Sequence, residues 1–103
     1  GDWLNQLIAY LQTTRDKAIA FIHAHIPKIN AVCPQGTYLL WLDCRKLNLD
    51  DEALALFFVQ EAQLGLSSGA MFGRGGEGFM RMNIGTPRAN VMEALDRLKS
   101  ALS

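Results

Sequence analysis

The segment 79–84, Phe-Met-Arg-Met-Asn-Ile, constrains the fold most, because its residue types alternate with a period of two. Successive side chains of an extended strand point to opposite faces. One face is wholly apolar and consists of Met80, Met82 and Ile84. The other presents Phe79, Arg81 and Asn83. The pattern predicts a strand that covers a hydrophobic core with one face and presents an arginine on the other.

Arg81 needs an anionic partner if it is buried, because the desolvation of an unpaired charge is costly. Its guanidinium fork matches a carboxylate through two parallel hydrogen bonds, which favours arginine over lysine for planar anions. Spacing alone favours an internal pair with Glu77 or Asp43, because protein carboxylates are commoner partners than ligands. The alternative is that Arg81 binds the carboxylate or phosphate of a ligand.

The run 73–78, GRGGEG, formally satisfies the dinucleotide-binding pattern G-x-G-x-x-G. That fingerprint requires a strand before the glycines and a helix that opens on them, so that phosphate meets the helix N-terminus. Here a strand pattern follows, and no long β-type run precedes. We therefore interpret the run as a glycine-rich connection leading into strand 79–84.

The strongest strand signal is the segment 37–44, whose residues are β-branched, aromatic or leucine apart from Asp43 and Cys44. Both of its faces are largely apolar, which predicts that both are covered. A small domain offers one layer of helices, so the second cover would come from a missing domain or subunit. An equal alternative is that loops or the first helix form this second cover.

Three helices are predicted around these strands. The first spans residues 2–26 and ends at Pro27, the second begins in an N-x-x-D arrangement at Asn48 and stops at Gly65, and the last follows a Thr86 cap with Pro87 in its first turn. The apolar residues of the first helix recur at helical spacing: Leu4, Leu7, Ile8, Leu11, Ala18, Ile19, Ile22 and Ile26.

The order of these elements predicts one α/β domain over residues 1–103, more closely an α+β two-layer sandwich. We expect a small mixed or antiparallel sheet with helices mainly on one face.

Composition excludes several function classes. Ten basic and ten acidic residues give no net charge, which argues against nucleic acid and against charge-driven membrane binding. No apolar run approaches the roughly 18 residues of a transmembrane helix. Cys33 and Cys44 lack metal-ligand spacing and indicate reduced thiols in the cytoplasm. His23 and His25 point in different directions on one helix, so they do not form a joint metal site. We expect no metal site.

Several motifs in order also carry a family resemblance. They are GTYLLWLD at 36–43, SSGAMFG at 67–73, GGEGFMRMNIGTPR at 75–88 and a closing amphipathic helix. Together they resemble the C-terminal small domain of fold-type I pyridoxal-phosphate enzymes. Within the class I/II aminotransferase superfamily, they are most similar to the cystathionine β-lyase-like (MalY/PatB) branch. The resemblance covers essentially all 103 residues. One departure is Ser68, where the family usually has proline.

The resemblance implies roles for Arg81 and Asn83. In this family the arginine of the R-x-N strand grips the α-carboxylate of the amino-acid substrate. The resemblance further implies a parent that uses pyridoxal 5′-phosphate, most often as a C–S β-lyase for sulfur amino acids, and that forms a homodimer. The catalytic lysine and the cofactor cup would belong to a large domain preceding residue 1, so this chain carries no catalytic residue and is expected to be inert alone.

Three alternatives remain open at the level of sequence. The parent could be a class I/II aminotransferase, which shares the same carboxylate grip. The chain could instead be a free-standing module in which Arg81 and Asn83 capture a small carboxylate, or a purely structural domain with Arg81 neutralised internally.

Overall fold

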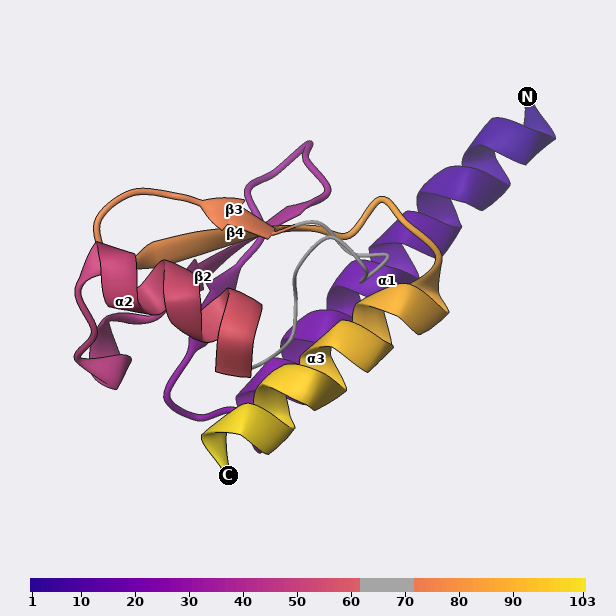
Figure 1. Ribbon diagram of the computed structural model, residues 1–103. Helices are drawn as coiled ribbons and strands as arrows, with labels where there is room; N and C mark the ends of the chain where they lie inside the picture. Colours follow the sequence, from indigo (N-terminus) through magenta and orange to yellow (C-terminus); the bar gives the residue numbers. More distant parts are fainter. Residues whose placement is uncertain (62–71) are drawn as a thin grey trace.

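The computed structural model describes residues 1–61 and 72–103, which form a four-stranded antiparallel sheet with three α-helices (Figure 1). The elements, in chain order, are α1 (Asp2–His25), β1 (Asn30–Val32), β2 (Leu39–Asp43), the 3-10 turn η1 (Arg45–Leu47), α2 (Asp51–Leu56), the π-helical continuation η2 (Phe57–Glu61), β3 (Phe72–Arg74), β4 (Phe79–Asn83) and α3 (Arg88–Leu102). The predicted α/β class is confirmed.

The two central strands of the sheet are β2 and β4, the two segments with the clearest strand patterns. The strand order is β1-β2-β4-β3, and every neighbouring pair is antiparallel. Leu40 is paired with Met82 and Leu42 with Met80 between the central strands. This register places the large apolar side chains of both strands on one face, where cross-strand pairs stabilise the sheet.

The core lies between that face and the helices. All three α-helices contribute buried side chains to the same cluster as the two central strands, so the helices cover one face of the sheet, as predicted. The cluster includes Ala18 and Ile22 from α1, Leu54 from α2, Leu40 and Leu42 from β2, Met80 and Met82 from β4, and Val91, Leu95 and Leu98 from α3. The predicted apolar face of segment 79–84 therefore lines the hydrophobic core.

The opposite face of the sheet is only partly covered within the described residues. Leu39, Trp41 and Asp43 alternate with the buried positions of β2 and are each half-buried. Part of the cover comes from the connection after β3, because Gly75 lies against the indole ring of Trp41. This face carries the arginine of β4.

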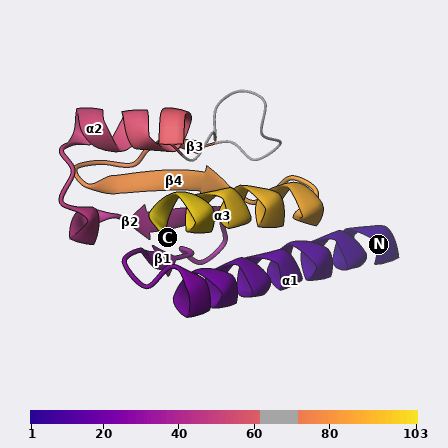
Figure 2. The same cartoon turned by 60° about the horizontal axis from the view of Figure 1, so that its bottom comes forward.

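Helix α1 departs from its predicted burial. Ala18, Ile22 and Ile26 are buried as expected, and α1 runs beside α3. Its first half, however, extends past the start of α3 (Figures 1 and 2). Leu4 and Leu7 are 43% and 44% exposed as a consequence, with Ile8, Trp3 and Tyr10 also exposed. The apolar spacing predicted a helix correctly, but half of the stripe meets no partner here.

Three local boundaries differ from those predicted. The N-cap of α2 is Asp50, whose Oδ1 accepts a hydrogen bond from the Ala53 N–H at 2.7 Å, whereas Asn48 adopts a left-handed conformation that closes η1. Pro87, not Thr86, is the N-cap residue of α3. The segment 28–36 contains the edge strand β1, which the sequence did not indicate. Gly65 and most of the SSG loop lie outside the described residues.

Candidate functional site

The outward face of β4 places Arg81 where an external ligand can reach it. Arg81 is exposed, with Trp41 opposite it on β2 and Gly73 opposite it on β3. One neighbour supplies a flat aromatic surface, and the other has no side chain. The guanidinium therefore lies on an open face rather than in the domain interior.

The internal ion pair predicted for Arg81 is wrong. Within residues 1–61 and 72–103, Arg81 forms no salt bridge with Glu77 or Asp43. Its hydrogen bond runs from Nε to the backbone carbonyl oxygen of Arg74 at 3.0 Å. A carbonyl oxygen carries no net charge, so the guanidinium keeps its full positive charge available to an anion.

Asp43 is unavailable to Arg81 because Arg45 already holds it. Arg45 donates from Nε to Oδ1 at 2.9 Å and from Nη2 to Oδ2 at 2.8 Å. The side-chain hydrogen bonds from Arg45 lower the pKa of Asp43 to about 2. Spacing could not identify this pairing, because η1 turns the chain so that Arg45 folds back onto the end of β2.

Asn83 lies on the same face of β4 as Arg81, two residues further along the strand. It is half-buried, and its Oδ1 accepts a hydrogen bond from the Gly85 N–H at 2.8 Å. Part of its hydrogen-bonding capacity thus holds the turn between β4 and α3. The structure places the two predicted substrate-binding residues together on one face, with Asn83 partly committed to that turn.

The glycine run before β4 is a hairpin connection, as predicted. Gly76 and Gly78 have positive φ angles of 115° and 78°, which side-chain-bearing residues rarely adopt. The Gly75 N–H donates to the Phe79 carbonyl at 3.0 Å, and the Phe79 N–H donates to the Gly76 carbonyl at 3.0 Å. Because β3 pairs with β4, the run joins two strands, which is incompatible with the dinucleotide fingerprint.

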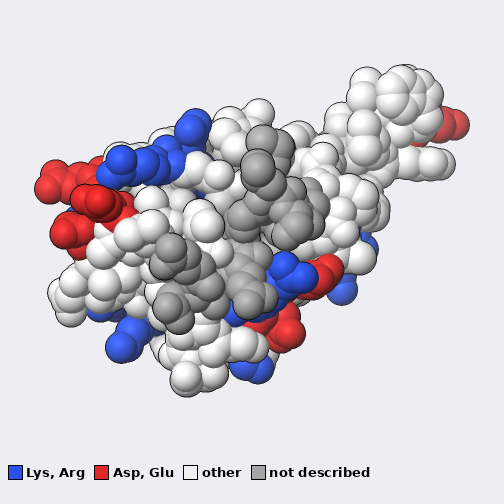
Figure 3. Space-filling model, in the orientation of Figure 1, with Lys and Arg blue, Asp and Glu red and all other residues white. Residues whose placement is uncertain are grey.

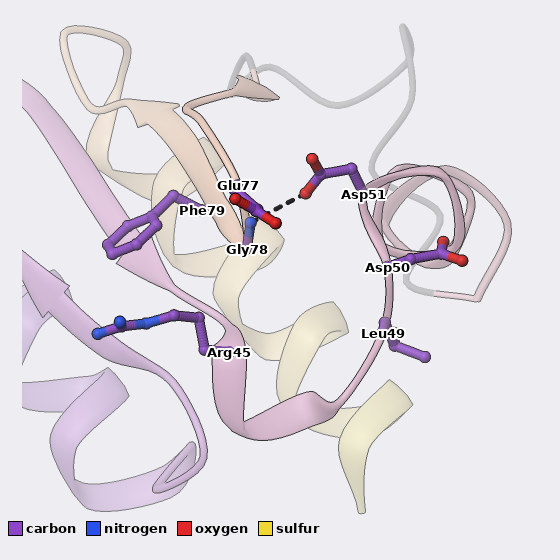
Figure 4. A pocket seen from close by; sticks show the side chains of 7 residues that line it. All are labelled: Arg45, Leu49, Asp50, Asp51, Glu77, Gly78 and Phe79. Atoms are coloured by element: carbon purple, nitrogen blue, oxygen red, sulfur yellow. Dashed lines mark hydrogen bonds between the residues drawn. The ribbon is translucent and has the colours of Figure 1, made fainter.

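A cavity of about 500 Å³ lies at the outer end of this hairpin (Figure 4). Two of its three carboxylates already have structural roles, since Asp50 caps α2 and Asp51 accepts a hydrogen bond from the Gly78 N–H at 2.9 Å. Figure 4 shows that contact, with the Phe79 ring beside Arg45. Its lining residues are Arg45, Leu49, Asp50, Asp51, Glu77, Gly78 and Phe79. The cavity does not include Arg81.

Two further absences apply to the part of the chain that the structure describes. No group of three or more histidine, cysteine, aspartate or glutamate side chains could hold a metal ion. No helix there is long and apolar enough to cross a membrane.

The chain's own lysines do not fit the residue that bonds a pyridoxal-phosphate cofactor. A lysine that bonds such a group needs a desolvated setting, in which its amine is more readily deprotonated. Lys17, Lys28 and Lys46 are exposed, and Lys99 is half-buried at the end of α3. We therefore assign no cofactor contact to residues of this chain.

Residues beside Arg81 were missed by the sequence reasoning. The sequence indicated only that segment 37–44, which contains Trp41, is covered on both faces, and that Gly75 belongs to a connection. The position of both residues next to Arg81 depends on the pairing of β2 with β4 and on the closure of the hairpin. Pairing partners are not contained in the pattern of a single strand, so no local signal could have found them.

Known proteins of similar sequence and fold identify the class to which this chain belongs. No protein-family model matches the chain. Cystathionine beta-lyase PatB from Bacillus subtilis is 38% identical over 103 residues, which is 100% of this chain and 27% of PatB.

Two solved structures are also similar. A candidate aminotransferase from Clostridium difficile 630, with bound pyridoxal phosphate, has a TM-score of 0.85 and 39% identity over 100% of this chain and 27% of its own. Cystalysin from Treponema denticola, which contains pyridoxal 5′-phosphate, has a TM-score of 0.83 and 36% identity over 99% of this chain and 26% of its own.

The fold is that of part of a pyridoxal-phosphate-dependent enzyme. Within this class, the chain belongs to the family of C–S lyases and aminotransferases that includes PatB and MalY. It spans about a quarter of the length of the relatives that it matches. The full-length enzymes of this family use pyridoxal phosphate.

Proposed function

We propose that this chain is the substrate-carboxylate-binding small domain, C-terminal in its parent, of a C–S β-lyase that acts on sulfur amino acids. Arg81 is the residue that holds the α-carboxylate, with Asn83 beside it. The observation that carries this proposal is the state of Arg81, which is exposed and has no carboxylate partner among the described residues. An arginine buried for a purely structural reason would be paired with an acid of its own domain.

The contact between Arg81 and the substrate carboxylate orients the substrate and takes no part in bond cleavage. A bidentate guanidinium contact fixes the direction of the substrate's α-carbon, and correct orientation lowers the entropic part of the barrier. The cofactor of the full-length enzymes supplies the electron sink for bond cleavage at that carbon. In this proposal, the large domain contributes the lysine and the cofactor-binding groups.

The choice of a lyase follows a relative that is named for that activity, cystathionine beta-lyase PatB. A second candidate is an aminotransferase, because the solved structure from Clostridium difficile is described with that activity and is equally similar. Both reactions use a carboxylate grip. A free-standing carboxylate-binding module is the third candidate and would require no second domain.

The first half of α1 supports docking onto further protein. It carries no charge from Trp3 to Thr14, and the projecting arm in Figure 3 is white except at its tip. Exposed apolar surface of this kind marks an interface. We assign it to the remainder of the parent enzyme, which forms a homodimer in this proposal.

A cytoplasmic setting is part of the same proposal and rests on Cys33 and Cys44, both free thiols.

The decisive experiment is Arg81→Ala in the full-length enzyme. We expect kcat/KM to fall by the equivalent of about 2–5 kcal/mol, the cost of removing one partner from a bidentate charged contact. Stability should change little, because Arg81 is exposed. Arg45→Ala is the matched control, since it removes an exposed arginine that is already paired with Asp43. Unchanged kinetics in Arg81→Ala, or a loss of stability with kinetics intact, would refute the proposal.

A second experiment tests whether the chain is inert alone. Pyridoxal phosphate added to the 103-residue chain should leave the visible spectrum of the cofactor unchanged and give no pyruvate from cystathionine, because none of its four lysines is buried. Turnover by the isolated chain would show that the catalytic machinery is not elsewhere.

A further inference from the structure

The Nε edge of the Arg81 guanidinium is already occupied. A guanidinium can meet a carboxylate side-on, through Nε and one terminal nitrogen, or end-on, through its two terminal nitrogens. In Arg81, Nε donates to the Arg74 carbonyl at 3.0 Å, which removes the side-on option. Arg45 provides the contrast within the same domain, because its Nε is free to bind and it holds Asp43 side-on through Nε and Nη2.

We propose that the substrate carboxylate meets Arg81 end-on, through Nη1 and Nη2, and that Gly75 and Trp41 are the positioning residues that keep the guanidinium in this orientation. The inference deepens the proposed function and rests on it. It specifies how the ligand is held and which neighbours decide that geometry.

Gly75 is the residue that lets the connection after β3 close over Arg81. A Cβ atom at this position would lie 2.6 Å from Cζ3 and 2.9 Å from Cε3 of Trp41, and 3.0 Å from Cγ of Arg81. Separations below 3.0 Å do not occur between real atoms of this kind, so any larger residue must displace the ring, the connection or the arginine. The Arg74 carbonyl that holds Nε belongs to the residue immediately before Gly75.

Trp41 acts through Gly75, against which its ring packs. It is paired directly with Arg81 across β2 and β4, and its six-membered ring contacts Gly75. On the far side, Nη2 of Arg81 lies 3.4 Å from the position a Cβ of Gly73 would take, so this side of the arginine is narrow as well. The guanidinium is thus held at Nε, and Gly73 and Gly75 lie close to the arginine side chain.

The test is Gly75→Ala in the full-length enzyme, read out as ligand selectivity. L-alanine and ethylamine are suitable probes, because ethylamine is alanine without its carboxylate. We expect the dissociation constant of L-alanine to rise about tenfold while that of ethylamine stays within about twofold, because only the carboxylate contact is disturbed. Equal weakening of both probes, or no change in either, overturns the proposal.

Two further variants separate positioning from general instability. Gly36→Ala is the matched control, because Gly36 has a φ of 80° but no atoms within 4 Å of a would-be Cβ, so alanine there adds strain without contacting Arg81. It should leave the selectivity for L-alanine unchanged. Adding Trp41→Phe to Gly75→Ala removes the crowded ring atoms and should restore at least half of the lost selectivity. Failure of this rescue overturns the role of Trp41.

A crystal structure of the wild-type full-length enzyme with bound L-alanine tests the geometry directly, even if Gly75→Ala does not fold. We expect both terminal nitrogens of Arg81 on the carboxylate and Nε still on the Arg74 carbonyl. A carboxylate bound through Nε would overturn the inference while leaving the proposed function standing. A carboxylate bound away from Arg81 would overturn both.

Discussion

Arg88 lies over the ring of Tyr10, a residue 78 positions earlier in the chain, and connects the start of α3 to α1. Its guanidinium carbon is 4.3 Å from the centroid of the tyrosine ring, and its backbone N–H donates to the tyrosine hydroxyl at 2.7 Å. Its Nε also donates to Oγ1 of Thr14, a fully buried polar side chain, at 3.0 Å. Because α3 follows β4 after a short turn, this contact also helps to position the strand that carries Arg81.

Arg88→Ala should therefore destabilise the domain. The substitution removes a cation–π contact and leaves the Thr14 hydroxyl without its arginine, so we expect the free energy of unfolding to fall by about 1–3 kcal/mol. Urea denaturation of the 103-residue chain measures this difference. Glu93→Gln is the control, because it removes only the exposed i,i+4 pair with Arg97 and should cost no more than about 0.5 kcal/mol. Equal losses of stability in the two variants would contradict the stabilising role of the Arg88 contacts.

The Asp43–Arg45 pair should make stability depend on acid pH. The pKa of Asp43 is lowered to about 2 by the hydrogen bonds from Arg45, so its stabilising effect is complete above the unfolded-state value of about 4 and is lost as the pH falls toward 2. Asp43→Asn should remove about 1 kcal/mol or less of acid-dependent stability. Unfolding curves between these pH values measure it. Arg45→Met should remove the same dependence; if it does not, another group is responsible.

The two cysteines should differ in reactivity. Burial raises the pKa of the Cys44 thiol to about 12, whereas Cys33 is only half-buried. At pH 8 we expect iodoacetamide to modify Cys33 at least about tenfold faster than Cys44, because the thiolate is the nucleophile and Cys44 stays protonated and shielded. Mass spectrometry of a time course measures the two rates. Added urea should abolish the difference, and equal rates in the native chain would contradict the burial of Cys44.

The exposed face of α1 should drive self-association of the isolated chain. Leu7→Lys should reduce association in sedimentation experiments while changing the free energy of unfolding by less than about 0.5 kcal/mol, because Leu7 is 44% exposed and touches little of the core.

Leu95→Ala provides the contrast for that experiment. Leu95 is fully buried, so this variant should lose about 2–5 kcal/mol of stability. If Leu7→Lys instead unfolds the chain, the first half of α1 belongs to the folding core.

The strand alternation was readable because it is local. Met80, Met82 and Ile84 are buried as the period of two predicts, and the outward position of Arg81 follows from the same alternation. The family motifs were equally readable, because their order along the chain is a sequence property. The helix of residues 2–25 was also predicted, since apolar spacing depends only on neighbours within a few turns.

What Arg81 contacts could be decided only by the tertiary structure. Spacing favoured Glu77 or Asp43 as its partner, but η1 brings Arg45 onto the Asp43 carboxylate. The pairing of β4 with β2 and β3 sets Trp41 and Gly73 opposite Arg81. A sequence determines which side of a strand a residue faces, because that depends on backbone geometry within the strand. It does not reveal which distant residues lie on that side, because strand order and hairpin closure are settled by packing of the whole core.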